Sequence, residues 1–142
     1  MATIIVDTLV DEADGSITDG DISLRDAIAL AAAGDLIIFS PTVFSPDAYN
    51  DPLVNGTIAI TQGGIKIDKD LTIDGDVTGD GIADVTLDGT GGTQGILSTT
   101  TGTDVHVHAL TFRGGFYANG GGFNGGGAIN AGRSSALRAF SI

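Results

Sequence analysis

The sequence of 142 residues contains no cysteine, no tryptophan and only three prolines. Without cysteine, neither a disulfide framework nor a thiolate metal site can form. No apolar run approaches the roughly 20 residues that a membrane-spanning helix needs. The first residues also lack the basic region and sustained apolar stretch of a secretory signal peptide, so we expect any export to depend on a missing segment or on a different secretion route.

Basic residues are also scarce, since six Lys and Arg stand against eighteen Asp and Glu, for a net charge of −12. Nucleic-acid binding depends on Lys and Arg that neutralise phosphates, so the composition predicts no nucleic-acid partner. The same charge is repelled by anionic membranes. Glu12 is the only Glu, and this bias toward Asp favours turns and cation sites. Solubility in salty surroundings is the alternative explanation.

What the chain does contain is 23 glycines, spread between short segments of alternating polarity. This pattern predicts many short strands joined by tight turns, in one domain long enough to bury a core. After a strand near the N-terminus and the segment DLIIFS, the predicted strands are TIAIT, IKID, LTID, VTLD, DVHVHA and LTFR.

A partial internal repeat favours one arrangement of these strands. IKIDKDLTIDG at 65–75 resembles VHVHALTFRG at 105–114 with one residue deleted, and VTLDG at 85–89 echoes the second half. Stacked coils produce such self-similarity, because each coil must present apolar residues inward at equivalent points. We therefore expect a mainly β fold, a parallel β-helix (solenoid), with a β-sandwich as the competing fold.

One helix is predicted, over residues 23–33. Ser23 is suited to the N-cap and Asp26 follows three residues later, as in a variant of the capping box. An apolar stripe at helical spacing follows, and Gly34 is expected to end the helix as its C′ residue. The stripe comprises Leu24, Ala27, Ile28 and Ala31. A short amphipathic helix ahead of a β-rich chain is expected to cover the open end of the solenoid.

The segment DGDVTGDGIADVTLDG at 74–89 has the spacing of a calcium-binding loop, with carboxylates on alternate residues and Gly81 at the sharp turn. The predicted ligands are oxygen atoms of Asp74, Asp76, Thr78, Asp80, Ile82 (through its carbonyl) and Asp84. The position of the closing Glu of a helix-loop-helix site is Leu87, and the flanks read as strands. The loop therefore predicts a fixed Ca²⁺ site between strands, with a plain Asp/Gly turn as the alternative.

Two further sets of residues are candidates for chemistry. His106 and His108 lie two apart on a predicted strand, so both face the same side and are either solvated or ligands of a transition metal completed by a neighbouring coil. Lys66, Lys69 and Arg113 are the mid-chain candidates for the base of a polysaccharide lyase, and nothing in their spacing singles one out.

Residues 6–39 contain Ser-Leu-Arg-Asp-Ala-Ile at Ser23–Ile28 and resemble the CSLREA-type N-terminal segment of bacterial secreted and surface right-handed parallel β-helix proteins. In that family two cysteines commonly match Ile17 and Ile22, so the resemblance implies an apolar contact in place of a disulfide. It also implies that the helix caps the first coil and that Arg25 points toward a carboxylate. GGGAIN at 125–130 resembles a motif of polymorphic outer-membrane protein repeats.

Together these features predict an N-terminal cap at 1–40 and the first coils of a right-handed parallel β-helix at 41–142, incomplete at the C-terminus. The expected function is a structural or adhesive, calcium-stabilised module of a bacterial extracellular or cell-surface protein. Its open C-terminal end is expected to allow homo-oligomers or filaments, and polysaccharide is a candidate ligand. The alternative is the N-terminal part of a calcium-dependent polysaccharide lyase or glycoside hydrolase.

Overall fold

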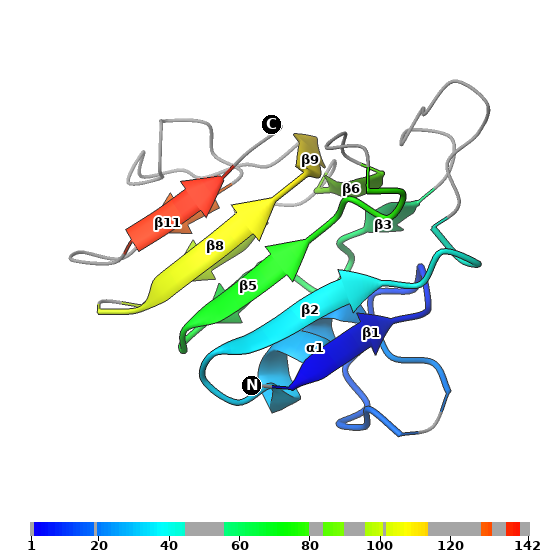
Figure 1. Ribbon diagram of the computed structural model, residues 1–142, viewed down its shortest axis with the longest axis horizontal. Helices are drawn as coiled ribbons and strands as arrows, with labels where there is room; N and C mark the ends of the chain where they lie inside the picture. Colours follow the sequence, from blue (N-terminus) through cyan, green and yellow to red (C-terminus); the bar gives the residue numbers. More distant parts are fainter. Residues whose placement is uncertain are drawn as a thin grey trace.

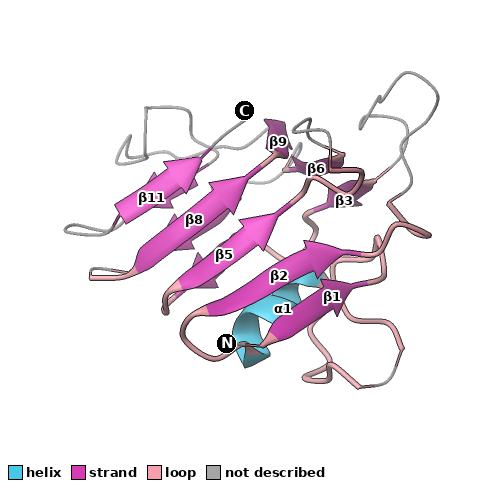
Figure 2. Ribbon diagram, in the orientation of Figure 1, coloured by secondary structure: helices cyan, strands magenta, loops and turns pink. Residues whose placement is uncertain are grey.

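The computed structural model describes residues 2–18, 20–44, 56–79, 84–89, 96–100 and 102–113, and the backbone of 129–131 and 136–139. Over these residues the protein is mainly β, with parallel sheets and one helix (Figure 2). In chain order the elements are β1 Thr3–Val6, α1 Leu24–Leu30, β2 Asp35–Phe39, β3 Thr57–Ala59, β4 Ile65–Ile67, β5 Leu71–Asp74, β6 Val85–Asp88, β7 Leu97–Thr99, β8 Asp104–His108, β9 Leu110–Arg113, β10 Ile129–Ala131 and β11 Ala136–Ala139.

The strands form three parallel sheets, in the orders β1-β2-β5-β8-β11, β10-β7-β4 and β3-β6-β9. From β2 to β8, each strand pairs with the strand three positions later in chain order. Figure 1 shows the five-stranded sheet as arrows lying side by side and pointing the same way. Parallel neighbours need long connections. Between β1 and β2 the connection contains α1, and from β2 onward the chain returns to each sheet after visiting the other two.

The core follows from the alternation of apolar residues along these strands. Ile4, Ile37, Ile73 and Val107 align across β1, β2, β5 and β8, and none is more than 7% exposed. Stacking of equivalent positions lets every returning strand bury its apolar face against the previous one. Val105 and Val107 are fully buried, which confirms that the intervening side chains of this strand face outward.

The alignment predicted from the internal repeat is correct only in its second half. VTLD and LTFR are structurally equivalent, because Val85 aligns with Leu110 in the β6–β9 pair. The first half was wrongly aligned: Leu71 of LTID aligns with Val105 of VHVH, whereas Ile65 of IKID aligns with Leu97. The similarity arose because every strand here needs the same apolar alternation, and it concealed β7, which the sequence did not predict.

Helix α1 begins where expected and ends early. Ser23 is the N-cap, and its Oγ accepts a hydrogen bond from the Asp26 N–H at 3.0 Å. The helix ends at Leu30, not at residue 33, because the C-cap Ala31 is extended. Gly34 does have a positive φ of 88°, but it lies in the turn into β2 and is not the C′ residue.

The helix packs against β1 and β4, and Figure 1 shows it behind β1 and β2, at the N-terminal end of the five-stranded sheet. Its apolar stripe is buried as predicted, and Leu24, Ala27 and Ile28 belong to the main core cluster. Ile17 and Ile22, in the loop before it, are partly buried and pack against the same cluster. Among the described residues, no helix has the length and apolarity to cross a bilayer.

Candidate metal centre

The loop that follows β5 is organised around Asp84, whose side chain is completely buried. Its Oδ2 accepts hydrogen bonds from the backbone N–H groups of Val77 at 2.8 Å and Thr78 at 3.1 Å, and from the Thr78 hydroxyl at 3.3 Å. Its Oδ1 is equally buried and accepts no hydrogen bond from any described residue. One oxygen of this carboxylate is therefore satisfied, and the other has lost water without gaining a partner among the described residues.

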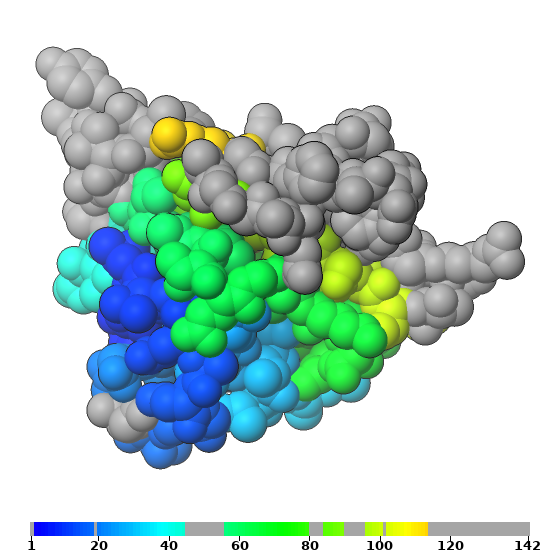
Figure 3. Space-filling view, turned by 180° about the vertical axis from the view of Figure 1, so that it is seen from behind, coloured from blue at the N-terminus to red at the C-terminus, as the bar shows by residue number. Residues whose placement is uncertain are grey.

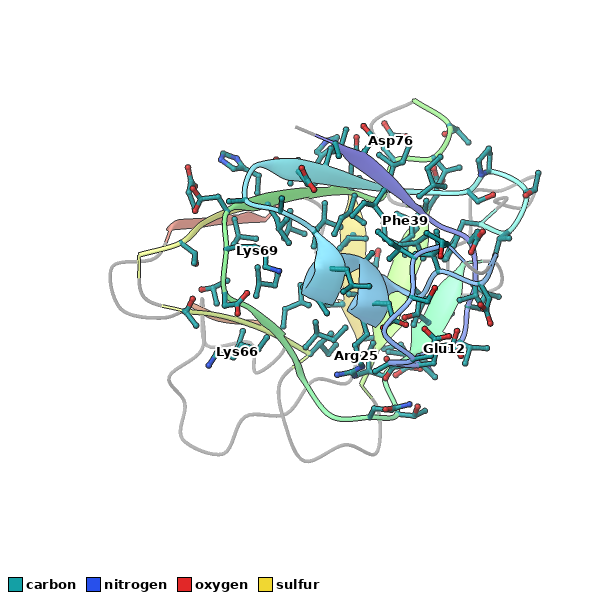
Figure 4. All side chains as sticks on the ribbon, turned by 90° about the horizontal axis from the view of Figure 1, so that it is seen from below. Glu12, Arg25, Phe39, Lys66, Lys69 and Asp76 are labelled. Atoms are coloured by element: carbon teal, nitrogen blue, oxygen red, sulfur yellow. The ribbon has the colours of Figure 1, made fainter. Side chains whose placement is uncertain are left out.

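The two acids at the start of the loop are used differently. Asp74 Oδ1 accepts from the Asp76 N–H at 2.9 Å and contacts His108 Nδ1 at 3.1 Å. Asp76 Oδ1 accepts from the Gly79 N–H at 2.8 Å, which closes a tight turn. Figure 4 shows Asp76 at the periphery, away from the helix. The loop connects strands as predicted, whereas Asp80 and Ile82 lie outside the described residues.

Among the described residues, Asp74, Asp76 and Asp84 do not form a group of three carboxylates with oxygens within 4.8 Å of one another. A group that does so is Glu12, Asp14 and Asp26, at the junction of the acidic loop and α1. Sequence reasoning assigned Asp26 to the helix cap alone. The signal available was the density of acids before the helix, but their convergence depends on how the loop folds back.

Within this second group, Asp26 has an evident structural function. Its carboxylate accepts from the N–H groups of Asp14 at 3.2 Å and Gly15 at 3.0 Å, and bonds the Ser23 hydroxyl at 3.1 Å. The side chain that a capping box would direct at the N-cap backbone instead holds the preceding loop. Asp26 is only 2% exposed, and these bonds compensate its burial.

The carboxylate expected near Arg25 is Asp11. The Arg25 Nε and one terminal nitrogen bond both oxygens of Asp11, at 2.7 and 2.9 Å, in a bidentate pair. Asp11 Oδ2 also accepts from the N–H groups of Thr61 and Gln62, and Arg25 donates to the Gly63 carbonyl at 2.6 Å. Seen from behind, the blue N-terminal loop lies against the green chain that follows β3 (Figure 3).

This environment sets the acidity of Asp11. Burial by itself would raise its pKa, but the hydrogen bonds from Arg25, Gln62 and Thr61 and the Arg25 charge outweigh burial and hold the pKa of Asp11 below 3.8. The pair is therefore charged at neutral pH. Its position between the cap loop and the β3–β4 turn makes it a structural clamp.

His106 and His108 both point outward from β8, as predicted, with side chains 35% and 43% exposed. Each contacts a different carboxylate: His106 Nε2 lies 3.3 Å from Asp104, and His108 Nδ1 lies 3.1 Å from Asp74 of the neighbouring strand. Among the described residues they do not enter a three-ligand group. The geometry supports two separate His–Asp contacts.

The three candidate bases also differ. Lys69 Nζ donates to the carbonyls of Ile28, Ala29 and Ala31 at 3.0–3.1 Å, so it caps the C-terminal end of α1. Lys66 is exposed and points away from the helix (Figure 4). Arg113 lies 3.9 Å from Asp88.

Comparison with known proteins gives no match to a family model, to a curated protein or to a solved structure.

Proposed function

We propose that this chain is a structural or adhesive module, the capped start of a right-handed parallel β-helix in an extracellular or cell-surface protein. From β2 to β8, each strand pairs with the strand three positions later in chain order. This pairing supports the fold, since a chain that winds through three faces revisits each face once per coil. The aligned inward residues support it too, because stacked coils bury equivalent positions on one another. The CSLREA-like segment at 6–39 is consistent with a cap for such a coil.

The bonds at the N-terminal end support a structural function for the cap. Lys69 and Arg25 are long, flexible cations, yet both are held by carbonyl oxygens, and Arg25 also by Asp11. Immobilising such side chains costs up to about 2 kcal/mol each in rotamer entropy, so these bonds must stabilise the fold enough to offset it. Their geometry fits a sealed end.

The observation that best supports a calcium site is the buried carboxylate of Asp84, which has one oxygen that no described residue bonds. Burying an ionised group without full compensation costs several kcal/mol, and a bound cation would supply the missing interaction at Oδ1. A hard cation prefers oxygen ligands, and the Thr78 hydroxyl already lies 3.3 Å from the same carboxylate. With Asp74, Asp76, Asp80 and the Ile82 carbonyl as the other predicted ligands, calcium would couple this loop to folding.

The test is the thermal unfolding of the full chain in 5 mM CaCl₂ and in chelator. Extracellular calcium modules bind at about 10⁻⁴–10⁻³ M, so 5 mM should add about 1–2 kcal/mol of stability by mass action. For a chain of this size we expect Tm to rise by about 5 °C. Asp84→Asn should abolish most of this rise, because a neutral amide cannot replace the carboxylate as a ligand.

Asp68→Asn is the matched control, because the Asp68 side chain is 66% exposed and lies outside the loop. This variant removes the same charge and should keep the full calcium response. Magnesium at equal concentration should stabilise less, since it demands strict octahedral geometry and gives up water reluctantly. A wild-type Tm that is identical in calcium and in chelator would refute the calcium proposal.

A further inference from the structure

The outer edge of β1 is an open edge of the five-stranded sheet (Figure 1). Leu36 N–H donates to the Ala2 carbonyl and Ser40 N–H to the Val6 carbonyl. The backbone N–H and C=O groups of the even-numbered residues of β1 therefore point toward β2. Since parallel ladders use alternate residues, the N–H and C=O groups of Thr3 and Ile5 point away from β2. No other described residue bonds them.

Natural edges are commonly protected by charge, proline, a bulge or a covering segment. The strand TIIV has no charge and no proline, and Ile5 is 47% exposed. Leu9 and Val10, just beyond the strand, are 41% and 58% exposed. Among the described residues, nothing covers the edge at Thr3 and Ile5, which is bordered by apolar side chains.

At one position of this edge, the backbone is already hydrogen-bonded to another segment of the protein. Asp7 N–H donates to the Ile22 carbonyl at 3.0 Å, and the Ile22 N–H returns a bond to Asp7 Oδ1 at 2.6 Å. The backbone N–H of Asp7, like those of Thr3 and Ile5, points away from β2. The returning segment thus occupies the last outward position of the edge and leaves the first two open.

The charge beside this edge selects the kind of partner. Asp7, Glu12, Asp14 and Asp21 all lie within the loop that follows β1, where Arg25 is already paired with Asp11, and Lys69 is held by the carbonyls of the helix. A second copy would bring the same acidic loop and a net charge of −12, so like-charge repulsion opposes it. A strand bearing Lys or Arg is attracted instead.

We infer that β1 accepts an added strand from a cationic partner, whose backbone pairs with Thr3 and Ile5 and whose basic residues face the acidic loop. Main-chain bonds give such strand addition its affinity, and alternate side chains give it specificity. With only two open residues the contact is weak and salt-sensitive. It does not require calcium, so it stands apart from the proposed function.

The probe is an acetylated, amidated peptide, Lys-Val-Thr-Val-Thr-Val-Lys, titrated into the ¹⁵N-labelled full chain in chelator at low salt. At saturation we expect amide hydrogen exchange of Thr3 and Ile5 to slow by about tenfold, because both N–H groups gain partners. Ile4 and Val6 should change little, since they already bond β2. Glu in place of both Lys, or Pro in place of the central Val, should abolish binding.

Ile5→Lys and Leu30→Lys form a matched pair, because each puts the same charge on an exposed apolar position and Leu30, on the helix, is 44% exposed. We expect Ile5→Lys to weaken peptide binding by about tenfold and Leu30→Lys to leave it nearly unchanged. The inference is overturned if both variants bind alike, if the Glu peptide binds as well as the Lys peptide, or if sedimentation shows that copies of the chain pair through this edge instead.

Discussion

At the scale of single residues, a close approach of two backbones constrains the position of Gly75. Gly75, at the end of β5, donates its N–H to the His108 carbonyl at 2.8 Å. A Cβ at Gly75 would collide with the Ala109 carbonyl oxygen and lie 2.6 Å from Leu110 Cδ2. Ala109 itself has a φ of 56°, so the neighbouring strand already bends sharply at this contact. Only glycine fits there without displacing a backbone.

Gly75→Ala should therefore lower the free energy of unfolding by about 3 kcal/mol, because the obstructing atom is backbone and cannot rotate away. Gly79→Ala is the control: its φ is 79°, but no atom of the described residues lies within 4 Å of the added Cβ. That variant should lose only about 1 kcal/mol, from conformational strain. Urea unfolding of both variants measures the difference, and equal losses would contradict the crowding described at Gly75.

At the scale of elements, α1 is a short helix whose ends are satisfied by groups outside it. Ser23 caps its N-terminal end locally. At the other end, the ammonium of Lys69, some forty residues later, donates to the carbonyls of Ile28, Ala29 and Ala31, of which a glycine cap would satisfy the first two. An isolated helix of seven residues is not stable in water, so α1 depends on this bonding and on its buried stripe.

Lys69→Met should destabilise the protein by about 2 kcal/mol, since it keeps the apolar stem but leaves helix carbonyls without their charged donor. Lys66→Met is the matched control, because Lys66 is exposed and carries the same charge. We expect less than about 0.5 kcal/mol for this variant. Thermal unfolding followed by circular dichroism compares the two, and similar losses would mean that Lys69 contributes only its charge.

At the scale of the whole molecule, one ion pair joins parts of the chain that are distant in sequence. Asp11 lies in the first loop, Arg25 on the helix, and Thr61 and Gln62 between β3 and β4. The contact therefore forms only when the cap and the sheets have come together. Its contribution to stability depends on pH, because the pKa of Asp11 is lowered in the folded protein.

A lowered carboxyl pKa stabilises the fold above the unfolded value of 3.8, and this contribution is lost as pH falls through the folded pKa. Asp11→Asn should thus cost about 3 kcal/mol at pH 7. Its difference from wild type should shrink as pH falls below the unfolded value of 3.8 and through the lowered pKa of Asp11 in the folded protein. Denaturant unfolding between pH 7 and pH 2 measures this. With Asp68→Asn as the control, a constant Asp11→Asn difference would disprove the linkage.

The sequence predicted what depends on local pattern. Period-two alternation located most strands, and the Ser23 cap with its apolar stripe located the helix. It did not predict β7, the early end of α1 or the true alignment of the repeat. Each of these is decided by a distant partner: Lys69 replaces the glycine cap, and pairing of Leu71 with Val105 overrides the likeness of LTID to LTFR.

The same distinction between local pattern and distant contact applies to the candidate metal site. The spacing of acids between β5 and β6 identified a loop suited to a cation, and the outward direction of His106 and His108 followed from strand parity. That Asp84 is buried, with one oxygen that no described residue bonds, could not be predicted from the spacing. Asp84 has that environment only because the loop folds over it and Val77 and Thr78 turn their N–H groups inward.

The sequence by itself therefore determined the chemistry of this protein: a strongly acidic, cysteine-free chain of short alternating strands, with one capped helix near its start. Periodicity, charge and capping are properties of neighbouring residues, so they can be recognised in the sequence alone. The tertiary structure alone decided which acids converge, which cations are held by carbonyls and which strand edge stays open. Those outcomes depend on contacts between residues tens of positions apart, which only the folded chain brings together.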